Sequence, residues 1–224
     1  MRPIDSFLTV FKAGLAIKYP EAGAVFAAMC EFLPSAHDDA IQRANDYLQD
    51  RLCELEDRID ETVVTRNEFA DLFKNTLATV QRTHYDEKIR AAVNVLANAC
   101  LSDDDSEKLS YIELDHFSRA VEQLSIGAFA MVRKLVLVHE SHNRIDRGID
   151  IEHLCDDFTP GVTIDRELGL GLLRELESFN IAIVDQANVT FNKKRMATGL
   201  LTTLGYKFHR HIMEGNHSPR PLTH

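Results

Sequence analysis

The feature that most constrains the fold of this chain is that strand-forming sequence is confined to one short region. Elsewhere, apolar residues recur at the three- and four-residue spacing of amphipathic helices. Two β-rich runs, 181–185 and 188–192, flank Gln186–Ala187 in a compact strand–turn–strand pattern. An isolated hairpin is marginal in water, so we expect it to pack on helices. The sequence predicts a mainly α-helical protein with one β-hairpin.

The segments before this hairpin predict its setting. Helical spacing covers 110–124 and 127–140, a short segment follows at 149–157, and a further helix covers Asp165–Phe179. The apolar stripe expected to face inward on that last helix consists of Leu168, Leu172, Leu173 and Leu176. Helix, short helix, helix and hairpin follow one another in this order in a winged helix-turn-helix. We therefore predict a winged-helix-like module, with a final helix starting near Thr202.

The first half of the chain predicts a helical bundle. A long helix begins at Ser35, and its apolar stripe consists of Ile41, Leu48, Leu52, Leu55 and Ile59. A coiled-coil dimer would fit this stripe, but it is shorter than three to four heptads, which favours packing against the protein's own helices. Two further core helices are expected, one starting at the capping box Thr65-x-x-Glu68 and one covering 86–100. The acidic loop 102–107 lacks the Gly and distal Glu of a calcium loop, so we expect a solvated loop.

Charge divides the chain unevenly. Residues 1–115 contain 12 basic and 22 acidic residues, whereas residues 116–224 contain 13 of each. The acidic half repels phosphate backbones, so a nucleic-acid role would have to come from the second half. The expected organisation is an acidic helical region over 1–115, a winged-helix-like domain over 116–213 and a polar tail over 214–224.

The N-terminal segment 6–33 is rich in Ala, Phe and Leu and predicts two short helices. We expect them to form a hairpin packed on the rest of the fold; the alternative is contact of residues 7–33 with a membrane surface. No secretory signal is visible, and no apolar run approaches the ~20 residues of a spanning helix. The four cysteines are scattered without a C-x-x-C pair, so we expect reduced, buried thiols in a cytoplasmic protein.

Several short stretches follow one another as in a group of bacterial proteins. They are Tyr19-Pro-Glu-Ala-Gly23, Leu52-Cys-Glu-Leu-Glu56, Phe69-Ala-Asp-Leu-Phe73, Ala92-Val-Asn-Val-Leu-Ala-Asn98 and Leu124-Ser125. Over most of residues 15–212 the chain resembles the Abi-alpha type of helical protein, associated with phage abortive infection. Thr203-Leu-Gly205-x-x-Phe208 is similar to the end of many bacterial winged-helix domains. The resemblance implies a role in phage defence, and its motifs are structural, with no catalytic residue to carry over.

The chain lacks the common catalytic and cofactor motifs. It contains no phosphate loop, no G-x-G-x-x-G after a strand, no H-E-x-x-H and no G-x-S-x-G elbow. We therefore expect a non-enzymatic protein without a cofactor. The one candidate metal site is His139-x-x-His142, which places two imidazoles on one helical face, with Glu140, His153, Cys155 or Asp156 as further ligands. No pattern fixes a third ligand, and exposed histidines near a helix end are the more ordinary interpretation.

The winged-helix prediction raises the question of DNA binding. The candidate nucleic-acid-binding residues are Arg166, Arg174, Lys193, Lys194 and Arg195. The helix 165–179 has four acidic residues against two basic ones, which opposes phosphate contact, and only residues 193–195, expected after the hairpin, form a basic cluster. We expect a regulatory or effector protein that acts through a protein partner or as a homodimer. The alternative is a DNA-binding transcriptional regulator.

Overall fold

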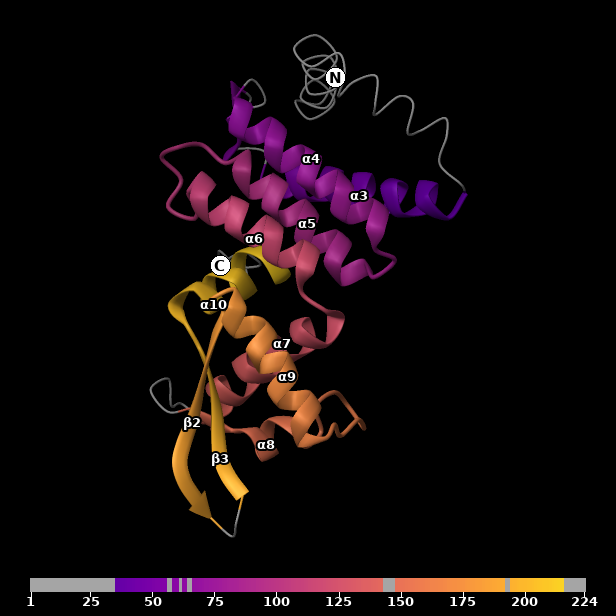
Figure 1. Cartoon of the computed structure of the whole chain (residues 1–224). Helices are drawn as coiled ribbons and strands as arrows, with labels where there is room; N and C mark the ends of the chain where they lie inside the picture. Colours follow the sequence, from indigo (N-terminus) through magenta and orange to yellow (C-terminus); the bar gives the residue numbers. More distant parts are fainter. Residues whose placement is uncertain are drawn as a thin grey trace, which may run out of the picture. The chain divides into compact units, whose positions relative to one another are not determined.

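The computed structural model describes residues 35–55, 58–60, 62–63, 66–142, 148–191 and 194–215. The described chain is mainly helical, as predicted, with a three-stranded antiparallel sheet near its C-terminal end (Figure 1). It divides into two compact units. Unit 1 contains the chain up to Glu122 together with the residues from His211 onward, and unit 2 is Gln123–Arg210.

Unit 1 is built from helices. They are α3 (Ser35–Glu54), α4 (Asn67–Arg82), α5 (Asp86–Ala99) and α6 (Tyr111–Gln123). Helix α5 packs against both α3 and α4. The stripes of these helices meet in a core that includes Leu52, Phe69, Val80, Ile89, Leu96, Leu114 and Phe117. The segment that begins at His211, near the C-terminal end, also packs in this unit, where the Asn94 side-chain amide donates to the carbonyl of Ile212 over 2.8 Å.

The helix starts in unit 1 differ from the capping boxes expected from sequence. Helix α4 begins at Asn67, with Arg66 at the N-cap position and no side-chain capping hydrogen bond. A reciprocal capping box is present on α6 instead: the Ser110 amide donates to the Glu113 carboxylate over 3.0 Å, and the Glu113 amide donates to Ser110 Oγ over 3.3 Å. Ser110-x-x-Glu113 has the same pattern as Thr65-x-x-Glu68, so spacing alone did not distinguish them.

Unit 2 alternates helices with the sheet. Its elements are α7 (Ile126–His142), β1 (Ile149–Asp150), α8 (Ile151–Cys155), α9 (Arg166–Ser178), β2 (Ala182–Phe191), β3 (Lys194–Leu201), α10 (Thr203–Lys207) and a π-helical segment, Phe208–Met213, whose last residues belong to unit 1. The strands lie in the order β1-β3-β2, all antiparallel. Helix α9 packs against α7, α8 and β2. Phe129 and Phe208 meet edge to face in the core, with ring centroids 5.8 Å apart.

The hairpin is longer than the sequence predicted, and its turn lies elsewhere. Strand β2 contains 182–185 and 188–191 of the two predicted runs, and its last residue, Phe191, pairs with Lys194, the first residue of β3. The register between β2 and β3 shifts between Gln186 and Thr190, at the site of the predicted turn. Polar residues there interrupt the alternation, and the strand accommodates them as an irregularity in the ladder. Strand β3 was not predicted, because its Ala and Gly residues have little strand propensity and its structure depends on pairing.

The start of α10 is a close backbone contact that requires glycine. A Cβ atom on Gly205 would lie 2.1 Å from the carbonyl oxygen of Ile181. Thr202 caps the helix by accepting a hydrogen bond from the Gly205 amide over 2.9 Å, and it donates to the Asn180 carbonyl over 2.6 Å. These contacts fix the chain where it leaves the sheet.

The predictions for the N-terminal segment and for the polar tail concern residues that are mostly outside the described ranges. The prediction that the cysteines are buried is wrong for one of them. The apolar segment 6–33 and most of the polar tail lie outside the described residues. Among the described residues, no helix is both long enough and apolar enough to cross a membrane. Cys100 and Cys155 are buried as expected, and burial raises the pKa of the Cys100 thiol to about 12. Cys53 is exposed, because it lies on the solvent side of α3, one residue after the buried Leu52.

Candidate functional site

Helix α9 packs against α7, α8 and β2 and also has a continuous exposed face. Its first turn is capped by Asp165, whose carboxylate accepts a hydrogen bond from the Leu168 amide over 2.7 Å. The inward face contains Gly169, Leu172, Leu173 and Leu176. Gly169 allows close packing on α8, because an added Cβ would lie 2.5 Å from Cys155 Sγ.

The outward face of α9 is a single line of residues. At 100° per residue, Glu167, Gly171, Arg174 and Ser178 lie within a narrow sector opposite the buried stripe, and all are exposed. Leu168, which the sequence predicted to face inward, lies at the rim of this face and is 50% exposed. The prediction is wrong because Gly169, without a side chain, takes the central position of the buried stripe.

Most other charges of α9 are engaged within unit 2. Arg166 Nε lies 3.7 Å from a carboxylate oxygen of Glu152. The Glu175 carboxylate accepts hydrogen bonds from the Ser125 amide and hydroxyl, and Glu177 accepts one from the Val184 amide over 3.1 Å. Glu167 and Arg174 form no ion pair with any residue that the structure describes. The outer face of α9 therefore carries one available charge of each sign.

The five predicted nucleic-acid-binding residues do not come together as a described basic patch. Arg166 is half-buried beside Glu152, while Arg174 is exposed at the middle of the outward face. Lys193 lies outside the described residues. Lys194 and Arg195 are the first residues of β3, paired with Phe191 and Thr190, and their side chains are not described. The basic run thus lies at the end of the hairpin, where β3 begins, and not after it as predicted, because the turn was misplaced.

The acidic loop after α5 is cross-linked by cations from the segment between α3 and α4. Arg58 donates to both oxygens of Asp105 over 2.6 and 2.8 Å and to Glu107 over 2.8 Å. Backbone bonds join the same segments: the Asp60 amide donates to the Cys100 carbonyl, and the Ser102 amide donates to the Arg58 carbonyl. The loop is therefore tied down by ion pairs and backbone bonds.

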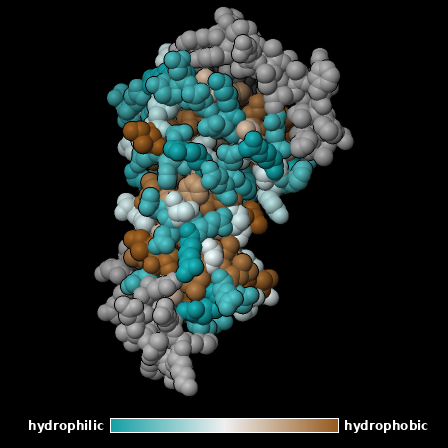
Figure 2. Space-filling model, in the orientation of Figure 1, coloured by the Kyte–Doolittle hydropathy of each residue, from teal (hydrophilic) through white to brown (hydrophobic). Residues whose placement is uncertain are grey.

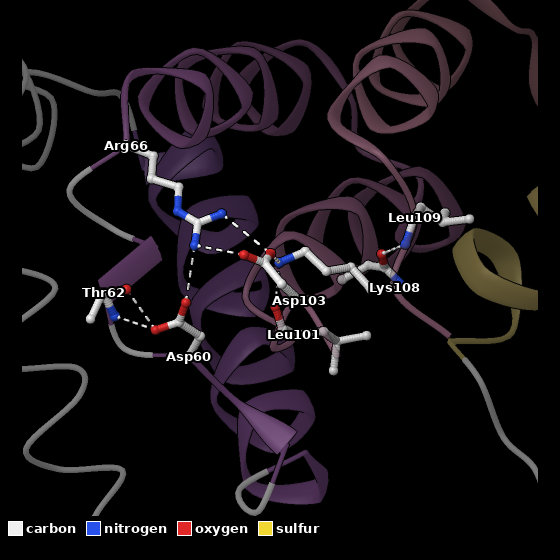
Figure 3. A network of polar contacts seen from close by, with 8 residues as sticks. Asp60, Thr62, Arg66, Leu101, Asp103, Lys108 and Leu109 are labelled. Carbon is white, nitrogen blue, oxygen red and sulfur yellow. Dashed lines mark hydrogen bonds and ion pairs between the residues drawn. The ribbon is translucent and has the colours of Figure 1, made fainter. Parts of the chain in front are cut away.

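Figure 3 shows a second cluster, in which Arg66 and Lys108 contact Asp103 of the same loop. The Arg66 guanidinium contacts Asp60 and Asp103 over 3.2 Å each, and Lys108 Nζ contacts Asp103 over 2.8 Å. Hydrogen bonds from Arg66 and Lys108 lower the pKa of Asp103 to about 2, although its side chain is largely exposed. Hydrogen bonds from Thr62, with the nearby charge of Arg66, lower the pKa of Asp60. Taken together, the two clusters pair Asp103, Asp105 and Glu107 of the loop with protein cations, so the loop is crosslinked to the segment that precedes α4.

His139 of the predicted metal pair is buried in unit 2. Its Nδ1 shares a hydrogen bond of 2.7 Å with the Tyr206 hydroxyl, and the two rings stack with centroids 6.0 Å apart. Burial, and to a smaller extent Glu140, raises the pKa of Tyr206. The His142 side chain is outside the described part of the chain. Across the described residues, no three His, Cys, Asp or Glu side chains form a group that could hold a metal ion.

No family model matches the chain, and searches of curated proteins and of solved structures found no match.

Proposed function

We propose that unit 2 is a winged-helix module in a non-enzymatic regulatory or effector protein that acts through protein–protein contacts. The order of its elements supports this proposal: three helices, α7, α8 and α9, are followed by the hairpin of β2 and β3. The short β1 between the first two helices pairs with β3, so that the sheet order is β1-β3-β2. A winged helix has this arrangement, and α9 takes the place of its recognition helix.

The outer face of α9 is the observation that carries the choice of a protein partner. The face combines the acidic Glu167, the small Gly171, the basic Arg174 and, at its rim, the half-exposed Leu168. A recognition helix in a DNA groove runs between two phosphate backbones, where an exposed carboxylate is repelled. Mixed charge beside an exposed leucine suits a protein surface better.

A DNA-binding regulator remains the second candidate because of the basic run at the tip of the hairpin. Lys194 and Arg195 are the first residues of β3, Lys193 precedes them in the sequence, and a wing in that position contacts a phosphate backbone. Three phosphate contacts give weak, salt-sensitive binding without sequence preference.

The non-enzymatic part of the proposal rests on the chemistry that the sequence offers. No catalytic motif is present. The polar cluster of unit 1 is built of matched ion pairs, and the buried His139 is hydrogen-bonded to a tyrosine. The resemblance to Abi-alpha proteins supplies the proposed setting, phage defence.

A gel-shift titration with duplex DNA at ~50 mM salt separates the two candidates, because backbone contacts are strongest at low salt. We expect no shift with the full chain. A shift that is lost in a Lys194→Glu, Arg195→Glu variant would favour the DNA candidate.

In parallel, a crosslinking capture from bacterial cells should recover a partner protein with the wild-type chain and fail to recover it with the Arg174→Glu variant. The proposal fails if capture is unchanged by that substitution, or if the pure protein shows a turnover that a single substitution abolishes.

Phage defence is tested separately, by plating phage on bacterial cells that express the chain. Fewer plaques than on cells with the Arg174→Glu variant would support this setting. Equal numbers would contradict it and leave the module's docking role to the capture experiment.

A further inference from the structure

The presence of glycine at position 171 of α9 is not explained by the packing of unit 2. It lies in the middle of the helix, it is exposed, and a Cβ added to it would meet no atom within 4 Å. Glycine is a poor helix former and alanine the best, so the helix alone would favour alanine here. Gly169, two residues earlier, is explained by its contact with Cys155, whereas nothing within unit 2 explains Gly171. A bare backbone on an exposed face is what a second backbone needs for close approach.

The charges around Gly171 identify what can approach it. Glu167 and Arg174 lie on the same outward line, on opposite sides of Gly171 along the helix axis. Their midpoint falls between Leu170 and Gly171. If an identical helix crosses antiparallel at that point, each Glu167 faces an Arg174 of the other copy. The pattern is therefore self-complementary under a twofold axis, as an isologous interface requires.

We infer that the protein self-associates through α9, with a second copy docked antiparallel across Gly171. The inference rests on the proposed function, in which α9 is a protein-docking face, and it names the partner as the same chain. Leu168, at the rim of the face, supplies apolar contact on both sides of the axis. The interface excludes DNA from α9, because the same residues cannot enter a groove while they are covered.

The geometry also predicts the strength of the association. One 13-residue helix from each copy buries less than the roughly 1,600 Å² of a standard stable interface. The association is therefore reversible and depends on concentration. Its two ion pairs are solvent-accessible, so it weakens as salt rises.

Sedimentation equilibrium of the full chain, up to ~1 mM protein, tests the inference, since an association with a Kd of about 1 mM is still detectable there. We expect Glu167→Arg and Arg174→Glu each to weaken dimerisation about tenfold, because each replaces two attractive pairs by two repulsive ones. The double variant restores the pairs with their signs exchanged, so it should recover most of the affinity. Gly171→Leu should abolish dimerisation while circular dichroism shows an intact helix, because leucine is a good helix former.

The matched control is the exposed pair Asp115 and Arg119 on α6, whose reversal, singly and together, should leave dimerisation unchanged. A wild-type chain that stays monomeric throughout overturns the inference. So does a dimer that none of the α9 variants affects, or a double variant that stays as weak as the single ones. If the chain is monomeric but Arg174→Glu still abolishes capture of another protein, self-association fails and the docking function stands. A DNA shift that depends on Arg174 overturns both.

Discussion

The two units carry their charge in different ways. Unit 1 contains the excess of acid, yet its acidic loop is matched by Arg58, Arg66 and Lys108. Unit 2 is evenly charged, but among the described residues it holds most of the exposed large apolar side chains: Leu137, Val162, Leu168 and Ile183. On the face shown in Figure 2, unit 1 is covered mainly by hydrophilic residues, as expected from its composition. Net charge thus does not locate the surface that is free to bind, because a charge already paired within the fold is not available to a partner.

The largest expected effect follows from the packed core of unit 2. Phe129 is 1% exposed and contacts Phe208 edge to face. Phe129→Ala should lower the free energy of unfolding by about 3–5 kcal/mol, through lost transfer free energy and the cavity left behind. Urea denaturation followed by circular dichroism measures this. Ile183→Ala, at an exposed position of β2, should change it by less than about 0.5 kcal/mol. Similar losses at the two positions would contradict the assignment of the core.

A smaller loss of stability is expected when a single methyl group is added near the start of α10. In Gly205→Ala, the new Cβ meets the Ile181 carbonyl, which belongs to the backbone and cannot rotate away. We expect the free energy of unfolding to fall by about 2–3 kcal/mol. The same substitution at Gly171 should raise it by about 0.5–1 kcal/mol, because the position is exposed and open. If both substitutions destabilise the protein equally, the helix itself needs Gly171 and its proposed role in docking is unsupported.

Sequence periodicity predicted the helices of both units, because burying an apolar stripe leaves a three- and four-residue repeat that no tertiary contact hides. The residues at which helices and strands begin and end were harder to predict from the sequence. The capping pattern at Thr65 looks the same as the one at Ser110, yet α4 begins at Asn67 with Arg66 at its N-cap position, whereas α6 has the reciprocal capping box. The hairpin turn was misplaced because Gln186-Ala-Asn188 resembles a turn in the sequence, whereas pairing with β3 continues the strand through these residues.

The candidate site was visible in part. The acidic and basic residues of α9 can be counted in the sequence, and their balance predicted a helix that is not basic. Which charges remain available depends on long-range partners such as Glu152 for Arg166 and Ser125 for Glu175, and no local pattern encodes them. The contrast between Gly169 and Gly171 could not be predicted from the sequence, because it depends on which side chains from other elements surround each glycine.

A moderate loss of stability is expected when Arg58, which links the segment before α4 to the acidic loop, is replaced. In Arg58→Met the stem still packs, but Asp105 and Glu107 lose their shared cation. We expect the free energy of unfolding to fall by about 1–2 kcal/mol, less than for a fully buried pair because Arg58 is 36% exposed. Arg82→Met is the matched control: Arg82 is 71% exposed and pairs with Glu122, so its loss should cost less than about 0.5 kcal/mol. Equal losses would mean that the Arg58 cluster is an ordinary surface ion pair.

The smallest effect is the pH dependence of Asp103, and its sign is fixed by the direction of the pKa shift. Hydrogen bonds from Arg66 and Lys108 lower the pKa of the folded carboxyl to about 2, from an ordinary value of 3.8. A lowered folded pKa stabilises the protein above the unfolded value, and this stabilisation is lost as pH falls from about 4 to about 2. Asp103→Asn removes the titration and keeps the shape. The thermal midpoint of the wild type should therefore exceed that of the variant at neutral pH, and the difference should shrink toward zero near pH 2. Asp104→Asn makes the same change one residue away, at an exposed side chain with no ion pair to a described residue, and is the matched control. A wild-type advantage over Asp103→Asn that stays constant from neutral pH to pH 2 would show that the cluster holds Asp103 by shape and not by charge.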